Sequence, residues 1–139
     1  MIIFCDGSCL GNPGAGGWAA IYIKNETIIK QISGYQKDTT NNRMELTAAI
    51  EAFKNLSKEV KSLDIYTDST YVKNGITDWI NSWKVTDWKK GKVKNIQLWK
   101  ELDILNSKLE VRWHWVKAHN GNKYNEIVDT LARNAAENK

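Results

Sequence analysis

Proline and cysteine are scarce in this chain of 139 residues, which contains one proline and two cysteines. Because glycine adds only nine residues, a collagen-like repeat and a proline- and glycine-rich disordered segment are both excluded. Two cysteines are too few for a disulfide scaffold, and an extended path from Cys5 to Cys9 would span about 13 Å, beyond disulfide reach. We therefore expect two free thiols in a reducing compartment.

Long hydrophobic runs are also missing. No stretch approaches the roughly 20 apolar residues that a membrane-spanning helix needs, and the N-terminus lacks the features of a signal peptide. The mass of 15.9 kDa and the 42% hydrophobic content suit one buried core. We expect a soluble, cytoplasmic monomer that makes no membrane contact, with a single domain over residues 1–139.

Negative charge is in slight deficit, with 16 acidic against 20 basic residues and a net charge of +4. Residues 84–94 contain five lysines and one aspartate, so this segment alone accounts for the whole net charge. Within and beside it stand four of the seven tryptophans: Trp79, Trp83, Trp88 and Trp99. A basic segment rich in aromatic rings indicates a polyanionic partner.

The spacing of apolar and turn residues predicts the element order βββαβααβα. Strands are expected at 2–6, 18–24, 27–36, 63–68 and 109–116. Helices are expected from the candidate caps at 39–42 to Leu56, over 69–83 with a break near Gly75, after a possible cap at Asn95, and over 125–138. The glycine-rich residues 7–17 are expected to form a loop. This order predicts an α/β fold, with a mixed five-stranded sheet whose first three strands are antiparallel and with helices on both faces.

Two aspartates stand where strands are expected to end, Asp6 after the first and Asp68 after the fourth. If these two strands pair, both carboxylates lie at one edge of the sheet, where sites form in α/β proteins. Glu45 and Asp129 lie in the first turns of two expected helices. Oxygen ligands without cysteine or histidine favour Mg²⁺ or Mn²⁺. Each acid taken alone is better explained as a solvated surface charge, and capping is a further ordinary explanation for an acid at a strand end or in a first helical turn.

Four sequence segments, taken together, indicate a function more specifically than any single acid does. Residues 3–14 (IFCDGSCLGNPG), 40–46 (TNNRMEL), 67–69 (TDS) and 115–119 (WVKAH), followed by Asn125, Glu126 and Asp129, resemble type 1 ribonuclease H of the bacterial kind. The resemblance covers essentially the whole chain and implies the ribonuclease H-like fold. It implies an endonuclease that hydrolyses the RNA strand of an RNA–DNA hybrid with two Mg²⁺ ions, which Mn²⁺ can replace, leaving 5′-phosphate and 3′-hydroxyl ends.

The resemblance also assigns site residues. The metal-binding carboxylates correspond to Asp6, Glu45, Asp68 and Asp129, and the mobile catalytic histidine to His119. Substrate contacts near the cut correspond to Gly7, Cys9, Asn12, Thr40, Asn41, Asn42, Arg43 and Asn125. The basic segment resembles the family's protrusion that grips the DNA strand, with Trp79, Trp83, Lys84, Lys89 and Lys90 as its contacts.

Some of these residues have a second explanation. The asparagines also suit turns and helix caps, and the spacing of Trp79, Ile80 and Trp83 also suits a buried helix face. Trp18 and Trp99 are expected in the core, and His114 in a structural role.

The chain departs from the family pattern at Thr70, where many relatives carry glutamine, and at Ala118, where many carry glycine. Met1 lies five residues before Asp6, so we expect the catalytic domain alone. Two other functions stay open: a hybrid-binding module without catalysis, and a related metal-dependent nuclease that acts on DNA.

Overall fold

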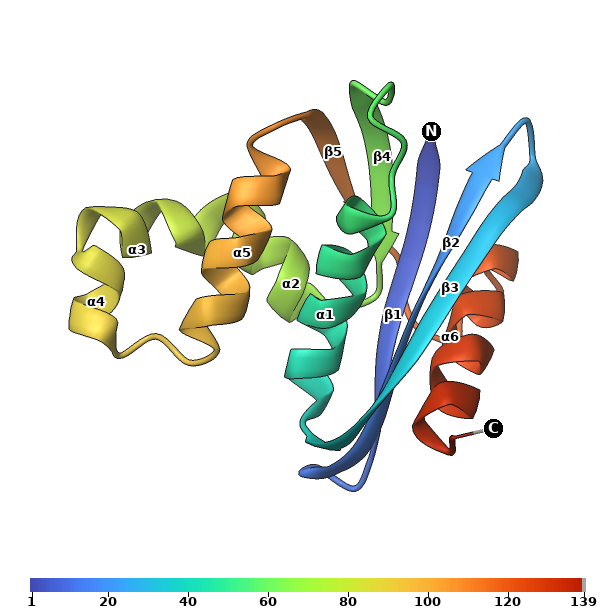
Figure 1. The fold of residues 1–139 in the computed structure, drawn as a ribbon, viewed down its shortest axis with the longest axis horizontal. Helices are drawn as coiled ribbons and strands as arrows, with labels where there is room; N and C mark the ends of the chain where they lie inside the picture. Colours follow the sequence, from blue (N-terminus) through green and yellow to red (C-terminus); the bar gives the residue numbers. More distant parts are fainter. Residues whose placement is uncertain (139) are drawn as a thin grey trace.

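A computed structural model describes residues 1–138, and its centre is a five-stranded sheet with the order β3-β2-β1-β4-β5 (Figure 1). The strands β1, β2 and β3 are antiparallel neighbours, and β4 runs parallel to both β1 and β5. The mixed sheet and the pairing of the first strand with the fourth are therefore confirmed. The strands are β1 (Ile2–Leu10), β2 (Gly14–Lys24), β3 (Thr27–Thr39), β4 (Ser62–Thr67) and β5 (Glu110–Trp115).

The expected loop over residues 7–17 is wrong, because β1 continues to Leu10 and β2 starts at Gly14, leaving a turn of only three residues. The glycines mark close packing instead of a loop. A Cβ atom at Gly7 would overlap the backbone of Met44 and Glu45, and one at Gly17 would overlap the backbone of the last helix. Glycine here lets helices approach the strands closely.

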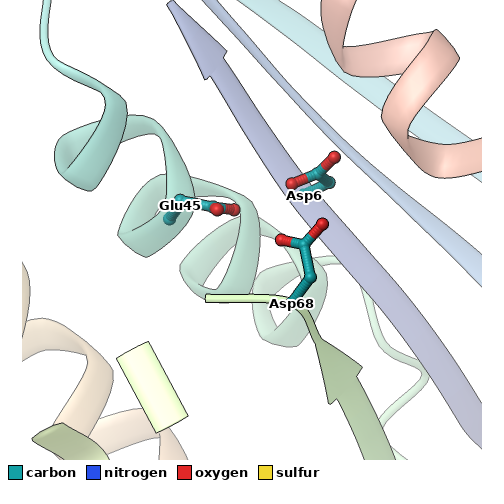
Figure 2. Close-up of side chains that lie close together, drawn as sticks. All are labelled: Asp6, Glu45 and Asp68. Carbon is teal, nitrogen blue, oxygen red and sulfur yellow. The ribbon is translucent and has the colours of Figure 1, made fainter. Parts of the chain in front are cut away.

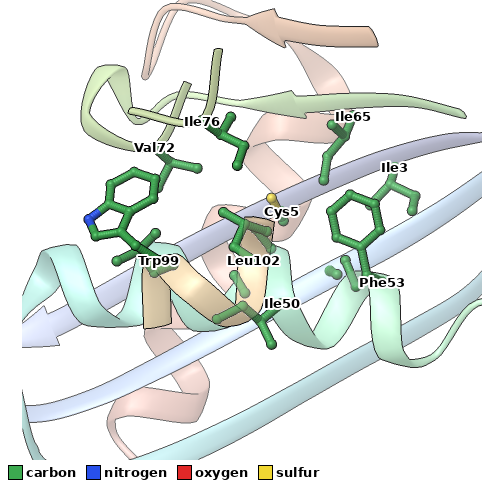
Figure 3. Close-up of a cluster of buried hydrophobic side chains, with 14 of the residues drawn as sticks. Ile3, Cys5, Ile50, Phe53, Ile65, Val72, Ile76, Trp99 and Leu102 are labelled. Atoms are coloured by element: carbon green, nitrogen blue, oxygen red, sulfur yellow. The ribbon is translucent and has the colours of Figure 1, made fainter. Parts of the chain in front are cut away.

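Helices cover both faces of the sheet, as expected. On one face lies α1 (Asn41–Lys54), and on the other lies α6 (Lys123–Ala136), which begins two residues earlier than predicted (Figure 1). Thr40 caps α1 by accepting a hydrogen bond from the Arg43 amide. Apolar side chains fill both interfaces; those on the α1 face include Ile3, Ile50, Ile65, Trp99 and Leu102 (Figure 3).

The segment between β4 and β5 is almost entirely helical. It contains α2 (Thr70–Asn74), a π-helical turn η1 (Gly75–Trp79), α3 (Ile80–Val85), α4 (Asp87–Gly91) and α5 (Ile96–Asn106). The break predicted near Gly75 is present as the end of α2 at Asn74 and the change to a π-helical turn at Gly75, although Gly75 keeps a right-handed helical conformation. The ring of Trp99 occupies the space that a Cβ atom at Gly75 would need, which explains the glycine.

The basic segment 84–94 projects from the rest of the fold with α3 and α4 (Figure 1). In α4, Asp87, Trp88, Lys89 and Lys90 all have positive φ, so this turn is left-handed. Asn95 also has positive φ and precedes α5, but its side chain does not cap that helix as predicted.

The tryptophans expected in the core divide into two cases. Trp99 is completely buried, as predicted, whereas Trp18 is only partly buried at the edge of the α1-side core. Among residues 1–138, no helix combines the length and the hydropathy that crossing a bilayer requires.

Candidate functional site

Three carboxylates converge at the end of β4 (Figure 2). Asp6 comes from β1, Glu45 from the second turn of α1, and Asp68 from the residue after β4, and one oxygen of each lies within 4.8 Å of the others. Asp6 does not end its strand as predicted. The pairing of β1 with β4 stops at Phe4 and Tyr66, so β1 runs past the end of β4, paired there only with β2, and presents Asp6 beside Asp68.

The amide of Gly7 joins two of these carboxylates. Its N–H lies 2.9 Å from Asp6 Oδ1 and 2.7 Å from Glu45 Oε1, and it donates to both. The close approach of α1 to Gly7 brings Glu45 within this distance. Gly7 was predicted to contact substrate, but it is buried and its N–H already has two carboxylate partners. In the structure this N–H holds the two carboxylates together.

The three acids repel one another in a largely dry site. Asp6 and Glu45 are 3% and 6% exposed. Burial raises the pKa of Asp6 well above its usual range, and the negative charges of Glu45 and Asp68 raise it further. Burial and the charge of Asp68 likewise raise the pKa of Glu45, although the Gly7 hydrogen bond opposes this shift. A cation placed among these oxygens would remove the repulsion.

Asp68 has support from two other elements. The indole N–H of Trp115 donates to the Asp68 carbonyl at 3.0 Å, and the Asn125 amide group lies 3.5 Å from Asp68 Oδ2. Asn125 was predicted to contact substrate, but it is 2% exposed, and its Oδ1 is buried without a hydrogen-bond partner. An unpaired buried oxygen beside a carboxylate is suited to a bound ion or its water.

Asp129 and His119 lie outside this group of three carboxylates. Asp129 forms an ion pair at 3.2 Å with Arg133, one turn later in α6. Its negative charge adds, after those of Glu45 and Asp68, to the raised pKa of Asp6. His119 is exposed in the loop between β5 and α6 and has a φ of 54°, and Ala118 is exposed beside it.

The donor set fits a divalent cation. All the candidate ligand atoms are carboxylate oxygens, which Mg²⁺ and other hard cations prefer. Within residues 1–138, no salt bridge links Asp6, Glu45 or Asp68 to a lysine or arginine. The buried charges therefore lack a compensating cation from the described chain, and a metal ion would supply one.

The predicted substrate residues near the start of α1 are brought together. Asn12 Oδ1 accepts a hydrogen bond from the Asn41 amide at 3.1 Å, which links the β1–β2 turn to the helix. Asn42 is exposed next to it. Cys9 is partly buried, and its Sγ lies 3.5 Å from the carbonyl oxygens of Gly14 and Thr39. The exposed Asn12 and Asn42 and the partly buried Asn41 thus lie at the N-terminal end of α1, the helix that also carries Glu45.

Sequence reasoning missed a series of hydrogen bonds that connects this region to Asn95, the residue after the basic segment, and to Tyr71 and Trp99. Arg43 Nη1 donates to Asn95 Oδ1 at 3.2 Å, and Asn95 Nδ2 lies 3.1 Å from the Tyr71 hydroxyl. The same hydroxyl accepts a hydrogen bond from the indole of Trp99. These partners are 24 to 52 residues apart in the chain, so no local spacing predicts the contact. These hydrogen bonds fix the Arg43 guanidinium beside the N-terminus of α1.

The aromatic residues of the basic region form one cluster. The Trp83 ring lies 5.2 to 6.1 Å from the rings of Trp79, Trp88 and Trp99. Trp79 is 39% exposed, whereas Trp83 is only partly exposed at the centre of the cluster. Of the two predicted substrate contacts, Trp79 therefore offers the larger free surface.

The predicted lysine contacts also differ in their surroundings. Lys84 forms an ion pair with Asp103 at 3.0 Å. Lys89 and Lys90 are exposed on the left-handed turn, and Lys89 borders a cleft of about 240 Å³ together with Tyr71, Trp83, Lys92 and Lys94. Three lysines around one cleft make it attractive to an anion.

Comparison with known proteins decides the family. The family model "RNase H" matches residues 1–137. The chain belongs to the RNase H family. A ribonuclease H of Wolbachia pipientis is 56% identical over 138 residues, which cover 97% of this chain and 94% of that relative.

Solved structures of the family share the fold. LC9-RNase H1, a type 1 RNase H with the type 2 active-site motif, is 33% identical with a TM-score of 0.85, over 99% of this chain and 72% of that one. LC11-RNase H1, solved in complex with an RNA/DNA hybrid, has a TM-score of 0.74 at 18% identity, over 99% of this chain and 96% of that one. The fold and family expected from the four sequence segments are both confirmed.

Proposed function

We propose that this RNase H family member is an endonuclease that hydrolyses the RNA strand of RNA–DNA hybrids, using divalent metal ions held by Asp6, Glu45 and Asp68. The observation that carries the proposal is the buried cluster of three carboxylates whose oxygens lie within 4.8 Å of one another. A cluster of this kind is unfavourable without a cation. Its presence in a chain 56% identical to a ribonuclease H supports a working active site.

For the metal we propose Mg²⁺, which Mn²⁺ can replace, with two ions in each site and Asp129 as a fourth ligand. The oxygen-only donor set supports this choice. Held by these carboxylates, such ions would supply activation of a water molecule and stabilisation of the departing 3′-oxygen, so that the product would carry a 5′-phosphate. The buried Oδ1 of Asn125 supports a solvated ion beside Asp68.

The remaining site residues are proposed to act on the substrate. Asn12, Asn41 and Asn42 would bind 2′-hydroxyls and base edges in the minor groove, together with backbone groups near Cys9. Thr40 and Arg43 would bind a backbone phosphate, which the forked guanidinium of Arg43 suits. His119 would carry protons to or from the reacting groups, since an imidazole can act as a general acid or base and the exposed loop leaves it accessible to substrate.

The DNA strand is proposed to lie along the basic segment. Exposed Lys89 and Lys90 would neutralise phosphates, with a smaller part for the paired Lys84. Trp79 would stack on deoxyribose, with Trp83 supporting it from the cluster. A neighbour of the same fold solved with an RNA/DNA hybrid supports such a partner.

We further propose that residues 1–139 act as one catalytic domain, as a monomer, in the cytoplasm. The family model covers residues 1–137, which supports the single domain. Cys5 and Cys9 are both free thiols, in keeping with a reducing compartment.

The test is cleavage of a hybrid labelled on each strand in turn, with Mg²⁺ and then with Mn²⁺. We expect cutting of the RNA strand only, with 5′-phosphate products. Equal cutting of double-stranded DNA would favour a DNA nuclease of the same fold. Binding of the hybrid without cleavage in either metal would instead indicate a binding module, and either result would overturn the proposal.

A further inference from the structure

We propose that Trp115 is a positioning residue for Asp68, acting through its indole N–H on the Asp68 backbone. The inference rests on the proposed function, in which Asp68 holds metal. Trp115 was not among the predicted site residues. Its side chain binds a main-chain atom of a residue 47 positions away in the sequence, a contact that no local sequence pattern reveals.

The position of this contact in the sheet explains its importance. The register between β4 and β5 ends at the pair Thr67 and Trp115, where the Val116 amide donates to the Thr67 carbonyl at 3.0 Å. One residue later β4 has ended, and Asp68 lies in a bend outside the strand. The Trp115 indole donates to the Asp68 carbonyl at 3.0 Å, so a side chain of β5 holds the backbone just beyond the last paired residue of β4.

Asp68 is therefore held on both sides of its peptide unit. Before it, Thr67 is fixed by β5, and after it, Ser69 caps α2 by accepting a hydrogen bond from the Val72 amide at 3.1 Å. Its carboxylate contacts the neighbouring acid Glu45 and, at a long 3.5 Å, the Asn125 amide group, and neither is a cationic partner. The direction of the Asp68 side chain thus depends chiefly on its backbone, which Trp115 anchors.

The neighbouring Trp113 shows that packing alone does not account for Trp115. Both tryptophans lie on one face of β5, and both donate an indole hydrogen bond, Trp113 to Asn106 Oδ1 at 2.9 Å. Trp113 packs against the core and against the ring of Phe53, whereas Trp115 is 47% exposed. Trp113 is suited to stabilise the fold, and Trp115 to orient the Asp68 backbone.

The experiment compares Trp115→Phe with Trp113→Phe, each of which keeps an aromatic ring and loses one indole N–H. Mn²⁺ and Mg²⁺ binding to the free protein is measured by calorimetry, together with melting temperature and steady-state cleavage of the hybrid. For Trp115→Phe we expect metal affinity and kcat to fall about tenfold, with KM within about twofold and little change in melting temperature. For Trp113→Phe we expect a lower melting temperature and unchanged metal affinity.

A second variant keeps the test informative if Trp115→Phe does not fold. Replacing Trp115 by 3-benzothienylalanine keeps the bicyclic ring and exchanges only the N–H for sulfur, so it should reproduce the loss of metal affinity. Unchanged metal affinity and kcat in this analogue would overturn the proposal. If the wild-type protein cleaves no hybrid but its Trp115 variants still lose metal affinity, the positioning role would be supported and the proposed function contradicted.

Discussion

The carboxylate site and the basic segment differ in almost every physical respect. Asp6 and Glu45 are nearly buried, and the site draws its residues from β1, α1 and the end of β4. Lys89 and Lys90 are exposed on one left-handed turn that projects from the sheet (Figure 1). Metal binding at the site thus depends on the exact placement of a few side chains, whereas DNA binding by the basic segment depends on the number of its charges.

This difference predicts two kinds of response to mutation. Charges held close together without water interact strongly, so removing one changes the others. Exposed charges are screened and act nearly independently, so each removal has a small effect that salt weakens. The proposed chemistry and the proposed binding of the DNA strand can therefore be separated by experiment.

The largest effect is expected for Asp6→Asn, which removes a metal ligand while preserving side-chain size. We expect kcat on the hybrid to fall at least about 100-fold, because the metal loses a carboxylate that faces both Glu45 and Asp68. Affinity for the hybrid, measured by filter binding, should change less than about threefold.

The control for this variant is Asp78→Asn, which neutralises an exposed aspartate in the π-helical turn. It should leave kcat and affinity unchanged. A comparable loss of hybrid affinity and kcat in Asp6→Asn would show that the site and the binding surface are not separate.

A smaller effect is expected for the triple variant Lys89→Ala, Lys90→Ala, Lys92→Ala. Binding of the hybrid should weaken about tenfold at 0.1 M salt, and the slope of log K against log salt should decrease by up to about 3. The value of kcat at saturating hybrid should not change. Lys84→Ala alone should have less effect than Lys89→Ala, because Asp103 already pairs with Lys84.

A matched control changes the same total charge elsewhere. Lys58, Lys61 and Lys108 are exposed beyond the C-terminal ends of α1 and α5. Their triple replacement by alanine should alter the salt slope little. An equal change of slope in both triple variants would mean that binding follows net charge and not the basic segment.

The two regions also differ in how far the sequence alone could describe them. The three carboxylates were found because strand, helix and family motif each have a local signal, and pairing of β1 with β4 then brings Asp6 and Asp68 together. The strand ends were misjudged at Gly7 and Gly17. Glycine there reflects the approach of helices distant in the chain, which local spacing does not report.

Side-chain partners across long separations were beyond prediction for the same reason. Trp115 reaches Asp68 and Asn95 reaches Arg43 only after the sheet and helices have assembled. The basic segment was recognised by composition, but composition does not say which tryptophan is exposed. The packing of Trp83 between Trp88 and Trp99 decides that Trp79 has the freer surface.

The smallest expected effect concerns stability against pH, which should report the carboxylate site and not the lysines. Burial raises the pKa of both Asp6 and Glu45, so the folded, metal-free protein keeps protons that the unfolded chain releases near its ordinary carboxyl pKa. The folded state then binds more protons, and its stability must fall as pH rises above that range. Between pH 5 and 8, in the presence of a chelator, we expect the free energy of unfolding to fall by at least about 1 kcal/mol.

Thermal melts should show that Mg²⁺ restores more stability at pH 8 than at pH 5. Asp6→Asn should be more stable than the wild type at pH 8 without metal, with a flatter pH profile, and the triple lysine variant should keep the wild-type profile. Asp64, whose hydrogen bonds from Arg112 and His114 lower its pKa to about 2, is ionised throughout this window. A wild-type melt that did not change with pH in chelator would contradict the repulsion inferred for the empty site, and with it the sharpest contrast between the two regions.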